Sequence, residues 1–317
     1  MTFSPFRQPV PRGHVVSGGV RRLGSPAVAD LLTFGALSHL NLLSDGYERT
    51  KERLVSLLGV QINLEIPARP GDDTDAFLFT LGGVITEAFC PRGVAERGQG
   101  RLLGLYGEHY LGAEMQVDDL AAAREICQRR GIRIIRDDGD VFFTHPGACC
   151  GVAWEVFGGD FHHPPAGGTE GDEGVPPHWT PLKPAAWWRD EHPLGVVGLA
   201  RVTVAVRNLA AATEQFRGLV AAEIVDKPAR AGADAVQLQV GDTVFELLAP
   251  TEDSSLGAFL ERYGERMRTT VYRVADLGRV EAHAAALGLR LEPGDAEDAV
   301  ALPPAETLNL RMEFTEA

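Results

Sequence analysis

Short segments in which apolar and polar residues alternate recur along the chain, separated by helical patterns and turns. The clearest unit opens with residues 110–117, whose alternation predicts a half-buried strand. A helix is predicted next, because the carboxylates of Asp118 and Asp119 can cap its first turn and Gly131 can end it in a left-handed conformation. Three more strands are predicted at residues 132–136, 141–144 and 151–157. The unit is therefore one strand, one helix and three strands.

This unit is repeated four times along the chain. Each copy has a corner between its first strand and its helix, and a closing strand with a central glutamate. The corners lie at Ser44, Val117, Val206 and Val274. The closing strands are ITEAF, AWEVF, VFELL and RMEF, which carry Glu87, Glu155, Glu246 and Glu313. Each glutamate follows its corner by 43, 38, 40 or 39 residues, and such regular spacing is typical of an internal structural repeat.

The repeat resembles the vicinal oxygen chelate superfamily, in which βαβββ modules pair into a half-open barrel around a metal ion. The stretch HPGACCGVAWEV is similar to the closing segment of methylmalonyl-CoA epimerase-like members, and FELLAPTEDSSLGAFLERYGE to their middle. The resemblance covers nearly everything from residue 36 to the end. It implies an α+β fold in which tandem modules form two half-open mixed-sheet barrels. It does not imply one reaction, since the superfamily includes isomerases, epimerases, lyases, ring-cleaving dioxygenases and metal-free binding proteins.

Changes in composition divide the chain into four parts. Residues 1–35 are rich in Gly, Pro and Arg and predict a flexible arm or a strap over the fold, without the apolar core of a signal peptide. Residues 36–157 hold the first two modules and residues 195–317 the other two. Residues 158–194 are a linker rich in Pro and Gly, and its three tryptophans predict that part of it packs back on one domain.

Composition and charge narrow the class of partner. The chain has 317 residues, which is enough for two domains. Its net charge of −14 argues against nucleic acid and anionic membranes as partners, and no apolar stretch is long enough to span a bilayer. Four cysteines without metal-type spacing predict reduced thiols in a cytoplasmic protein. We expect a small-molecule partner with a carbonyl or aromatic group, and the modules could also pair between the two copies of a homodimer.

The resemblance implies where a metal would bind. In the superfamily the ligand on the first strand lies five residues before the corner and is usually His or Gln, and it converges with the closing glutamate. In the first module pair these positions are His39, Glu87, Gly112 and Glu155. Gly112 has no side chain, so Glu114 on the same strand face and His109 just before that strand are its candidate replacements.

One imidazole with two or three carboxylates is a credible site for divalent Mn, Fe, Co or Zn. The predicted metal ligands are His39, Glu87, His109 and Glu155. A carboxylate that does not bind the metal, Glu87 or Glu114, is predicted to move a proton beside the carbonyl of the substrate. The predicted substrate contacts are Asn41, Gln116 and Arg201.

The second module pair is predicted to be degenerate for metal binding. Its first-strand positions are Arg201 and Thr269, and its closing glutamates are Glu246 and Glu313. Arginine stays protonated and has no lone pair to offer a cation. We therefore expect Arg201 to neutralise one of these glutamates in the cleft.

Three functions remain open at this point. The primary hypothesis is a metal-dependent enzyme that performs proton transfer, as an isomerase or epimerase, or lyase chemistry beside a carbonyl. One alternative is a ring-cleaving, extradiol-type dioxygenase, which the two-domain length favours although Arg201 and Thr269 stand where the resemblance would place its two histidines. The other alternative is a metal-free binding or sequestration protein. Metal retention distinguishes it from both enzymes, and oxygen consumption distinguishes the two enzymes.

Overall fold

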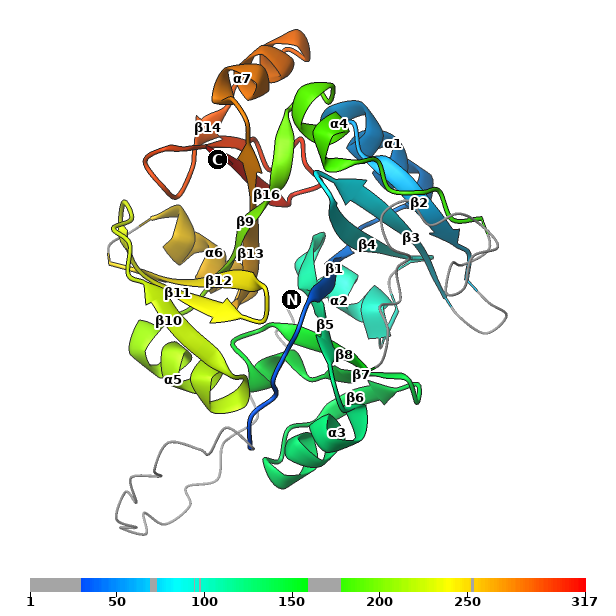
Figure 1. Ribbon diagram of the computed structural model, residues 1–317, viewed down its shortest axis with the longest axis vertical. Coiled ribbons are helices and arrows are strands. Elements are labelled where there is room, and N and C mark those ends of the chain that lie inside the picture. Colours follow the sequence, from blue (N-terminus) through cyan, green and yellow to red (C-terminus); the bar gives the residue numbers. More distant parts are fainter. Residues whose placement is uncertain (1–29, 69–72, 94, 97, 159–177, 252–253) are drawn as a thin grey trace, which may run out of the picture.

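The computed structural model consists of two similar halves, each with two modules of the predicted kind. It describes residues 30–68, 73–93, 95–96, 98–158, 178–251 and 254–317. Figure 1 shows the N-terminal half, coloured blue to green, beside the C-terminal half, coloured green to red.

The N-terminal half contains the first two modules. The first module is β1 (Leu37–Leu43), α1 (Tyr47–Leu58), β2 (Gln61–Ile66), β3 (Thr74–Leu81) and β4 (Val84–Pro91). The second module is β5 (His109–Val117), α3 (Leu120–Arg129), β6 (Ile134–Asp137), β7 (Val141–Thr144), a 3-10 helix (Pro146–Ala148) and β8 (Ala153–Gly158). The two modules are connected by α2 (Gly98–Tyr106).

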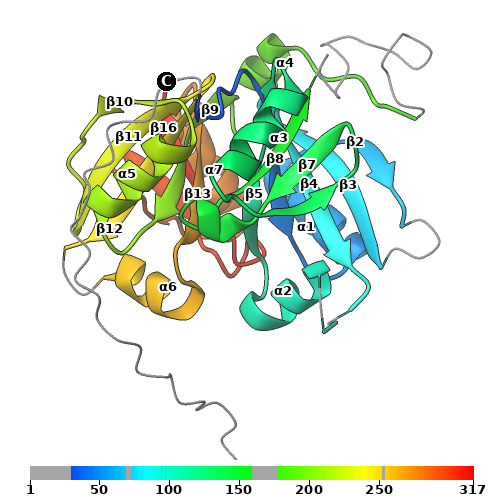
Figure 2. The same ribbon diagram turned by 90° about the horizontal axis from the view of Figure 1, so that it is seen from below.

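The C-terminal half repeats this order. The third module is β9 (Val196–Ala205), α5 (Leu209–Leu219), β10 (Ala222–Asp226), β11 (Ala233–Val240) and β12 (Thr243–Pro250). The fourth module is β13 (Arg266–Val274), α7 (Leu277–Ala286), β14 (Glu292–Pro293), β15 (Ala299–Leu302) and β16 (Arg311–Glu316). A short helix, α4 (Ala185–Asp190), precedes β9, and α6 (Ser255–Tyr263) connects the two modules. Figure 2 shows the connecting helices α2 and α6 on the same side of the molecule.

The two modules of each half meet through their first strands. The strand orders are β2-β3-β4-β1-β5-β8-β7-β6 and β10-β11-β12-β9-β13-β16-β15-β14. In the first sheet β1 pairs antiparallel with β5, and these strands pair parallel with β4 and β8. In the second sheet β9 and β13 pair in the same way with each other and with β12 and β16. The predicted α+β fold of tandem βαβββ modules is confirmed.

Local sequence signals explain where the helices begin and end. The Asp119 side chain accepts a hydrogen bond of 2.9 Å from the Ala122 backbone N–H, so it caps α3 as predicted. Helix α1 ends at Gly59, whose φ of 64° is the left-handed conformation that favours glycine. The predicted strand at residues 141–144 matches β7, and β5 begins one residue before its predicted start.

A continuous hydrophobic core joins the two halves. Trp154 on β8 is fully buried, and its ring centroid lies 5.0 Å from that of Phe34, which precedes β1. The same ring lies 6.0 Å from Phe216 on α5 and 5.1 Å from Phe245 on β12. Since Phe216 and Phe245 belong to the C-terminal half, β8 is packed directly against that half.

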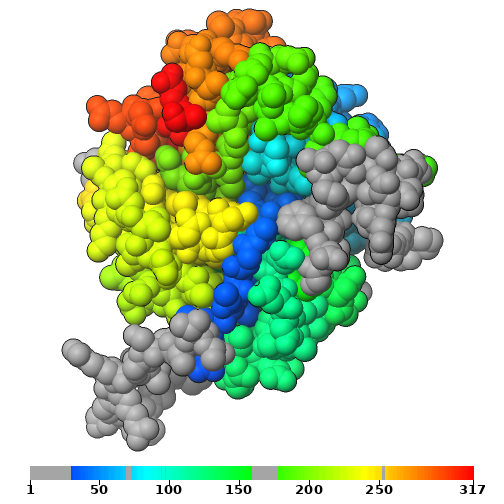
Figure 3. Space-filling model, viewed as in Figure 1, coloured from blue at the N-terminus to red at the C-terminus, as the bar shows by residue number. Residues whose placement is uncertain are grey.

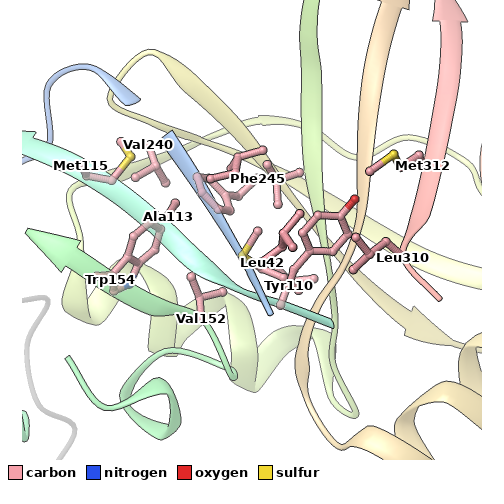
Figure 4. Close-up of a cluster of buried hydrophobic side chains, with 14 of the residues drawn as sticks. Leu42, Tyr110, Ala113, Met115, Val152, Trp154, Val240, Phe245, Leu310 and Met312 are labelled. Atoms are coloured by element: carbon pink, nitrogen blue, oxygen red, sulfur yellow. The ribbon is translucent and has the colours of Figure 1, made fainter. Parts of the chain in front are cut away.

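Apolar side chains of both halves meet in this shared core. Figure 4 shows Leu42, Tyr110, Ala113, Met115, Val152 and Trp154 of the N-terminal half together with Val240, Phe245, Leu310 and Met312 of the C-terminal half. Polar contacts accompany them: the Tyr110 and Thr270 hydroxyls lie 2.8 Å apart and share a hydrogen bond, and Arg53 forms an ion pair with Glu306. Each half therefore supplies part of the other half's buried surface.

The segment before β1 crosses from one half to the other. Leu32 exchanges two backbone hydrogen bonds with the C-terminal half, donating to Leu219 O and accepting from Ala221 N. Three residues later, the Gly35 N–H donates to Gln116 O on β5. Figure 3 shows this segment as a blue band between the surfaces of the two halves.

The structure describes only part of the predicted N-terminal arm and of the predicted linker. Residues 1–29 of the arm and 159–177 of the linker lie outside the described residues. In the described part of the linker, Trp179 and Trp188 are buried, in agreement with the prediction that this segment packs back on the fold. Among the described residues, no helix is long and apolar enough to cross a membrane.

Removal of the Trp154 ring should destabilise both halves together. We expect Trp154→Ala to lower the free energy of unfolding by about 3–5 kcal/mol, because it leaves a cavity where side chains from both halves meet. Urea denaturation followed by circular dichroism should show a single transition at a lower midpoint. The control is Leu105→Ala, whose exposed side chain should contribute less than about 0.5 kcal/mol. Two separate transitions in the wild type would contradict a shared core.

Candidate metal centre

Cross-strand pairing gathers one histidine, one asparagine and three glutamates on one face of the N-terminal sheet. His39 on β1 lies opposite Glu114 on β5, and Glu114 lies opposite Glu155 on β8. Asn41 follows His39 by two residues on β1, and Glu87 on β4 lies opposite Asn41. Directly opposed residues point to the same face of a sheet, and so do residues two apart in a strand. The register therefore directs these five side chains to one region.

The imidazole of His39 lies among three carboxylates. Its Nδ1 is 2.9 Å from Glu114 Oε2, and its Nε2 is 3.3 Å from Glu87 Oε2 and 3.6 Å from Glu155 Oε2. His39, Glu114 and Glu155 each offer a ligand atom within 4.8 Å of the others, and no second such group of His, Cys, Asp or Glu occurs in the described part of the chain. The Glu87 side chain is the most accessible, at 13% exposed against 3% for Glu114 and 8% for Glu155.

Two neighbouring polar groups orient this cluster. The Asn41 Nδ2 donates a hydrogen bond of 2.7 Å to Glu155 Oε2. The Ser38 hydroxyl lies 3.1 Å from His39 Nδ1. Contacts of this kind restrict the rotamers of metal ligands and are part of what tunes a metal site.

Burial and like charge shift the pKa values in the cluster. Burial raises the pKa of Glu155 to about 7, and the charges of Glu114 and Glu87 act in the same direction against the opposing effect of His39. Burial alone would lower the pKa of His39, but the Glu114 charge and hydrogen bonds to all three glutamates raise it well above its ordinary value. Without a cation, the cluster therefore retains protons near neutral pH.

The C-terminal sheet has glutamates at the same register positions and pairs them with arginines. Glu246 on β12 accepts from Arg201 Nε at 3.0 Å and from Arg230 Nη2 at 2.6 Å. Glu313 on β16 accepts from Arg311 Nε at 2.6 Å. The predicted ion pair between Arg201 and Glu246 is thus present. These carboxylates are neutralised by guanidinium groups, which cannot bind a metal.

The residues of the N-terminal site fit a divalent cation. Glu87 and Glu155, the counterparts of Glu246 and Glu313, have His39 as their ion-pair partner in place of an arginine. One imidazolium supplies at most one positive charge among three carboxylates, and an excess of buried negative charge is costly. A divalent ion would balance that charge, and imidazole nitrogen and carboxylate oxygen are donors that Mn, Fe, Co and Zn accept.

Gly112 cannot take part in the site. A Cβ atom at this position would lie 1.8 Å from the Ala153 carbonyl oxygen, because β5 and β8 approach closely there. Glu114, two residues along the same strand face, is the β5 residue that reaches His39. Gln116 continues this face by a further two residues and lies opposite Phe157.

His109 lies outside the group formed by His39, Glu114 and Glu155. It starts β5 opposite Leu43, and its Nδ1 is 2.7 Å from the Gly107 carbonyl oxygen. Its ring packs edge-on against Tyr106 with centroids 5.7 Å apart. Burial lowers the pKa of His109 to about 4, so its imidazole is neutral at physiological pH.

An apolar wall beside Glu87 was not identified from the sequence. Leu78 on β3 lies opposite Glu87 and forms a buried cluster with Ile85 and Trp179. On the other side of the histidine and carboxylate cluster, Phe143 on β7 lies opposite Glu155. The tryptophans of the Pro- and Gly-rich linker were the available signal, but the sequence does not indicate which strand they cover.

Comparison with known proteins supports the fold over nearly the whole chain. No family model and no curated protein matches it. A mutant of 4-hydroxymandelate synthase from Streptomyces coelicolor superposes with a TM-score of 0.65 at 14% identity, covering 89% of this chain and 92% of that one. A fusion of a xylose isomerase-like TIM barrel with 4-hydroxyphenylpyruvate dioxygenase has a TM-score of 0.58 at 13% identity, covering 94% of this chain and 50% of that one.

The chain has the vicinal oxygen chelate fold. Methylmalonyl-CoA epimerase from Mycobacterium tuberculosis, at 23% identity, matches 38% of this chain and 88% of its own with a TM-score of 0.36, which is too low to carry an argument. Within this fold, the described residues place the histidine and carboxylate cluster in the N-terminal pair of modules.

Loss of protons from this cluster should make the metal-free protein less stable as the pH rises. The folded-state pKa of Glu155, about 7, lies above its ordinary value of 4.5, so its contribution is present below pH 4.5 and lost as the pH rises through 7. The raised pKa of His39 acts with the same sign. We expect chelator-treated protein to lose on the order of a few kcal/mol of unfolding free energy between pH 5 and pH 8 in urea titrations.

Glu155→Gln should flatten this pH dependence, because the amide does not titrate. The matched control is Glu48→Gln, which changes a largely exposed glutamate on α1 and should leave the profile as in the wild type. Identical profiles for wild type and Glu155→Gln would contradict the assigned pKa of Glu155.

Proposed function

We propose that this protein is a divalent-metal-dependent enzyme that acts beside a carbonyl group of a small molecule. The observation that carries the proposal is the cluster of His39 with three buried or nearly buried carboxylates, set against the arginine-neutralised counterpart in the C-terminal sheet. His39, Glu114 and Glu155 would hold the ion, since their donor atoms converge. The ion is Mn, Fe, Co or Zn according to this donor set.

The proposed chemistry is proton transfer, as in an isomerase or epimerase, or a lyase reaction that begins with proton removal. A bound divalent ion would act as a Lewis acid that polarises the substrate carbonyl. Glu87 is the candidate base, because it lies outside the group of three converging ligands and is the most accessible of the glutamates. Its Oε2 would accept the proton from the carbon next to the carbonyl.

The surroundings of the cluster indicate how a substrate would be held. The wall of Leu78, Ile85 and Trp179 beside Glu87 offers apolar contact to the body of a substrate. Asn41 Oδ1 is buried and has no hydrogen-bond partner among the described residues, so it can accept a bond from a substrate hydroxyl. Gln116 is a further polar candidate on the same face, whereas Arg201 belongs to the C-terminal sheet.

A dioxygenase is the second candidate function, and a specific observation favours it. The two solved structures that match along nearly the whole chain are named as a 4-hydroxymandelate synthase and as a fusion containing 4-hydroxyphenylpyruvate dioxygenase. An aromatic substrate would suit the wall formed by Trp179 and its neighbours. Against this function, the cluster contains one histidine, whereas non-haem Fe(II) oxygenases commonly use two histidines and one carboxylate.

The state of the cysteines bears on the compartment of the protein. All four cysteines are free and buried, which suits the reducing cytoplasm that the sequence predicts. Homodimer formation stays a prediction from the fold resemblance, and sedimentation of the purified full chain would test it.

Metal content of the purified chain tests the proposed centre directly. We expect about one divalent ion per chain by mass spectrometry after reconstitution with Mn, Fe, Co or Zn. His39→Ala and Glu155→Ala should each lose it, because each removes a converging ligand. His109→Ala is the matched control, and it should keep the metal if His109 is held only by its local contacts. Loss in His109→Ala would make that residue a ligand, and a wild type that binds no metal would favour the metal-free binding protein.

Glu87→Gln should separate proton transfer from metal binding. We expect this variant to keep its metal but to exchange the α-proton of carbonyl compounds with D₂O at least about 100-fold more slowly, which is the usual contribution of a general base. Glu52→Gln, on the exposed face of α1, should behave as wild type. Metal-dependent oxygen consumption with an aromatic keto acid, unaffected by Glu87→Gln, would instead support the dioxygenase.

A further inference from the structure

The C-terminal sheet carries a second group of polar side chains at its centre. Arg201 and Thr203 lie two residues apart on β9, and Thr203 lies opposite Thr269 on β13. These three side chains therefore share one face of two adjacent strands. Glu246 lies opposite Thr203 on β12 and belongs to the same face. By register, the group corresponds to the metal cluster of the N-terminal sheet.

Ion pairing leaves one positive charge in this group. Glu246 is fully buried and accepts hydrogen bonds from Arg201, Arg230 and Gln237, so two guanidinium groups share one carboxylate. The neighbouring arginines have acidic partners of their own, since Arg311 contacts Glu313, Asp295 and Glu292, and Arg268 binds Asp295. The charge excess therefore lies at Arg201 and Arg230.

Three hydrogen-bonding atoms in the same group lack a partner among the described residues. Arg201 Nη2, Thr203 Oγ1 and Thr269 Oγ1 are buried and have no hydrogen-bond partner among the described residues. Thr203 and Thr269 are 0% exposed and Arg201 is 8% exposed. Guanidinium N–H groups can only donate, and threonine hydroxyls can donate to an acceptor that lies between them. Buried donors of this kind normally have a partner.

We propose that this face binds a small oxyanion, most simply a monocarboxylate, through Arg201, Thr203 and Thr269. A single negative charge would match the unbalanced positive charge, and carboxylate oxygens are strong acceptors for guanidinium and hydroxyl groups. The nearly complete burial of the three side chains restricts the ligand to a small group. The site is independent of the metal centre, because its donors all lie on the C-terminal sheet.

Calorimetric titration of the full-length His39→Ala chain tests this proposal without a contribution from the metal centre. Formate, acetate and inorganic phosphate are titrated at constant ionic strength, with chloride as the reference anion. We expect saturable binding of one anion per chain. Tighter binding of formate or acetate identifies a carboxylate site, and tighter binding of phosphate identifies a phosphate site. Both results support an oxyanion site, and neither depends on the function proposed for the N-terminal centre.

Substitutions then assign the binding to these residues. Arg201→Gln and Thr269→Val should each weaken binding at least tenfold, because each removes one donor that faces the anion. Thr270→Val is the matched control, since Thr270 is the next residue on β13 and faces Tyr110 in the core. It should bind as well as the parent chain. If circular dichroism shows that Arg201→Gln does not fold, Thr203→Val provides a second test. Absence of saturable binding, or binding unchanged by the Arg201 and threonine variants, would overturn the proposal.

Discussion

The antiparallel pairing of the first strands, β1 with β5 and β9 with β13, is the constraint on which both halves depend. A strand presents successive residues to opposite faces, so each central strand contributes to the core and to the functional face at once. On β1, Leu40 and Leu42 are fully buried in the core, while His39 and Asn41 belong to the cluster. A slip of one residue would exchange the two sets. Burial of the apolar set therefore fixes the position of the ligands.

The same register supports two different charge arrangements. In the N-terminal sheet, carboxylates surround a histidine, which leaves an excess of negative charge that suits a cation. In the C-terminal sheet, the first-strand position holds Arg201, whose guanidinium neutralises Glu246 and makes a metal unnecessary there. Both arrangements obey the rule that buried charge needs a partner. Duplicated modules can therefore keep one backbone while their sites diverge in chemistry.

Packing against the C-terminal half also helps to hold β8, one of the strands that form the N-terminal site. Trp154 and Glu155 are neighbours on β8, and they point to opposite faces. The Trp154 ring packs against Phe216 and Phe245 of the C-terminal half, while Glu155 reaches His39. Packing between the halves thus holds the strand that supplies a candidate metal ligand. The crossing segment at Leu32 and Gly35 adds backbone hydrogen bonds to both halves.

Much of the architecture could be predicted from the sequence, because strand alternation, helix caps and the spacing of the closing glutamates are local signals. The repeat predicted four modules, and the cap at Asp119 and the strand at residues 141–144 are present as expected. The sequence also singled out His39, Glu87 and Glu155, since each stands at a defined position of its module, and it offered Glu114 as a catalytic carboxylate in place of the side chain that Gly112 lacks.

Tertiary structure decided which of these residues meet. Only the pairing of β1, β5 and β8 shows that Glu114 and Glu155 converge on His39, and that His109, although close in sequence, lies outside that group. The exclusion of a side chain at Gly112 and the wall formed by Trp179 also depend on segments that are distant in the chain. A local pattern determines the face on which a side chain lies. The partner strand, which a single sequence does not specify, determines what that side chain contacts.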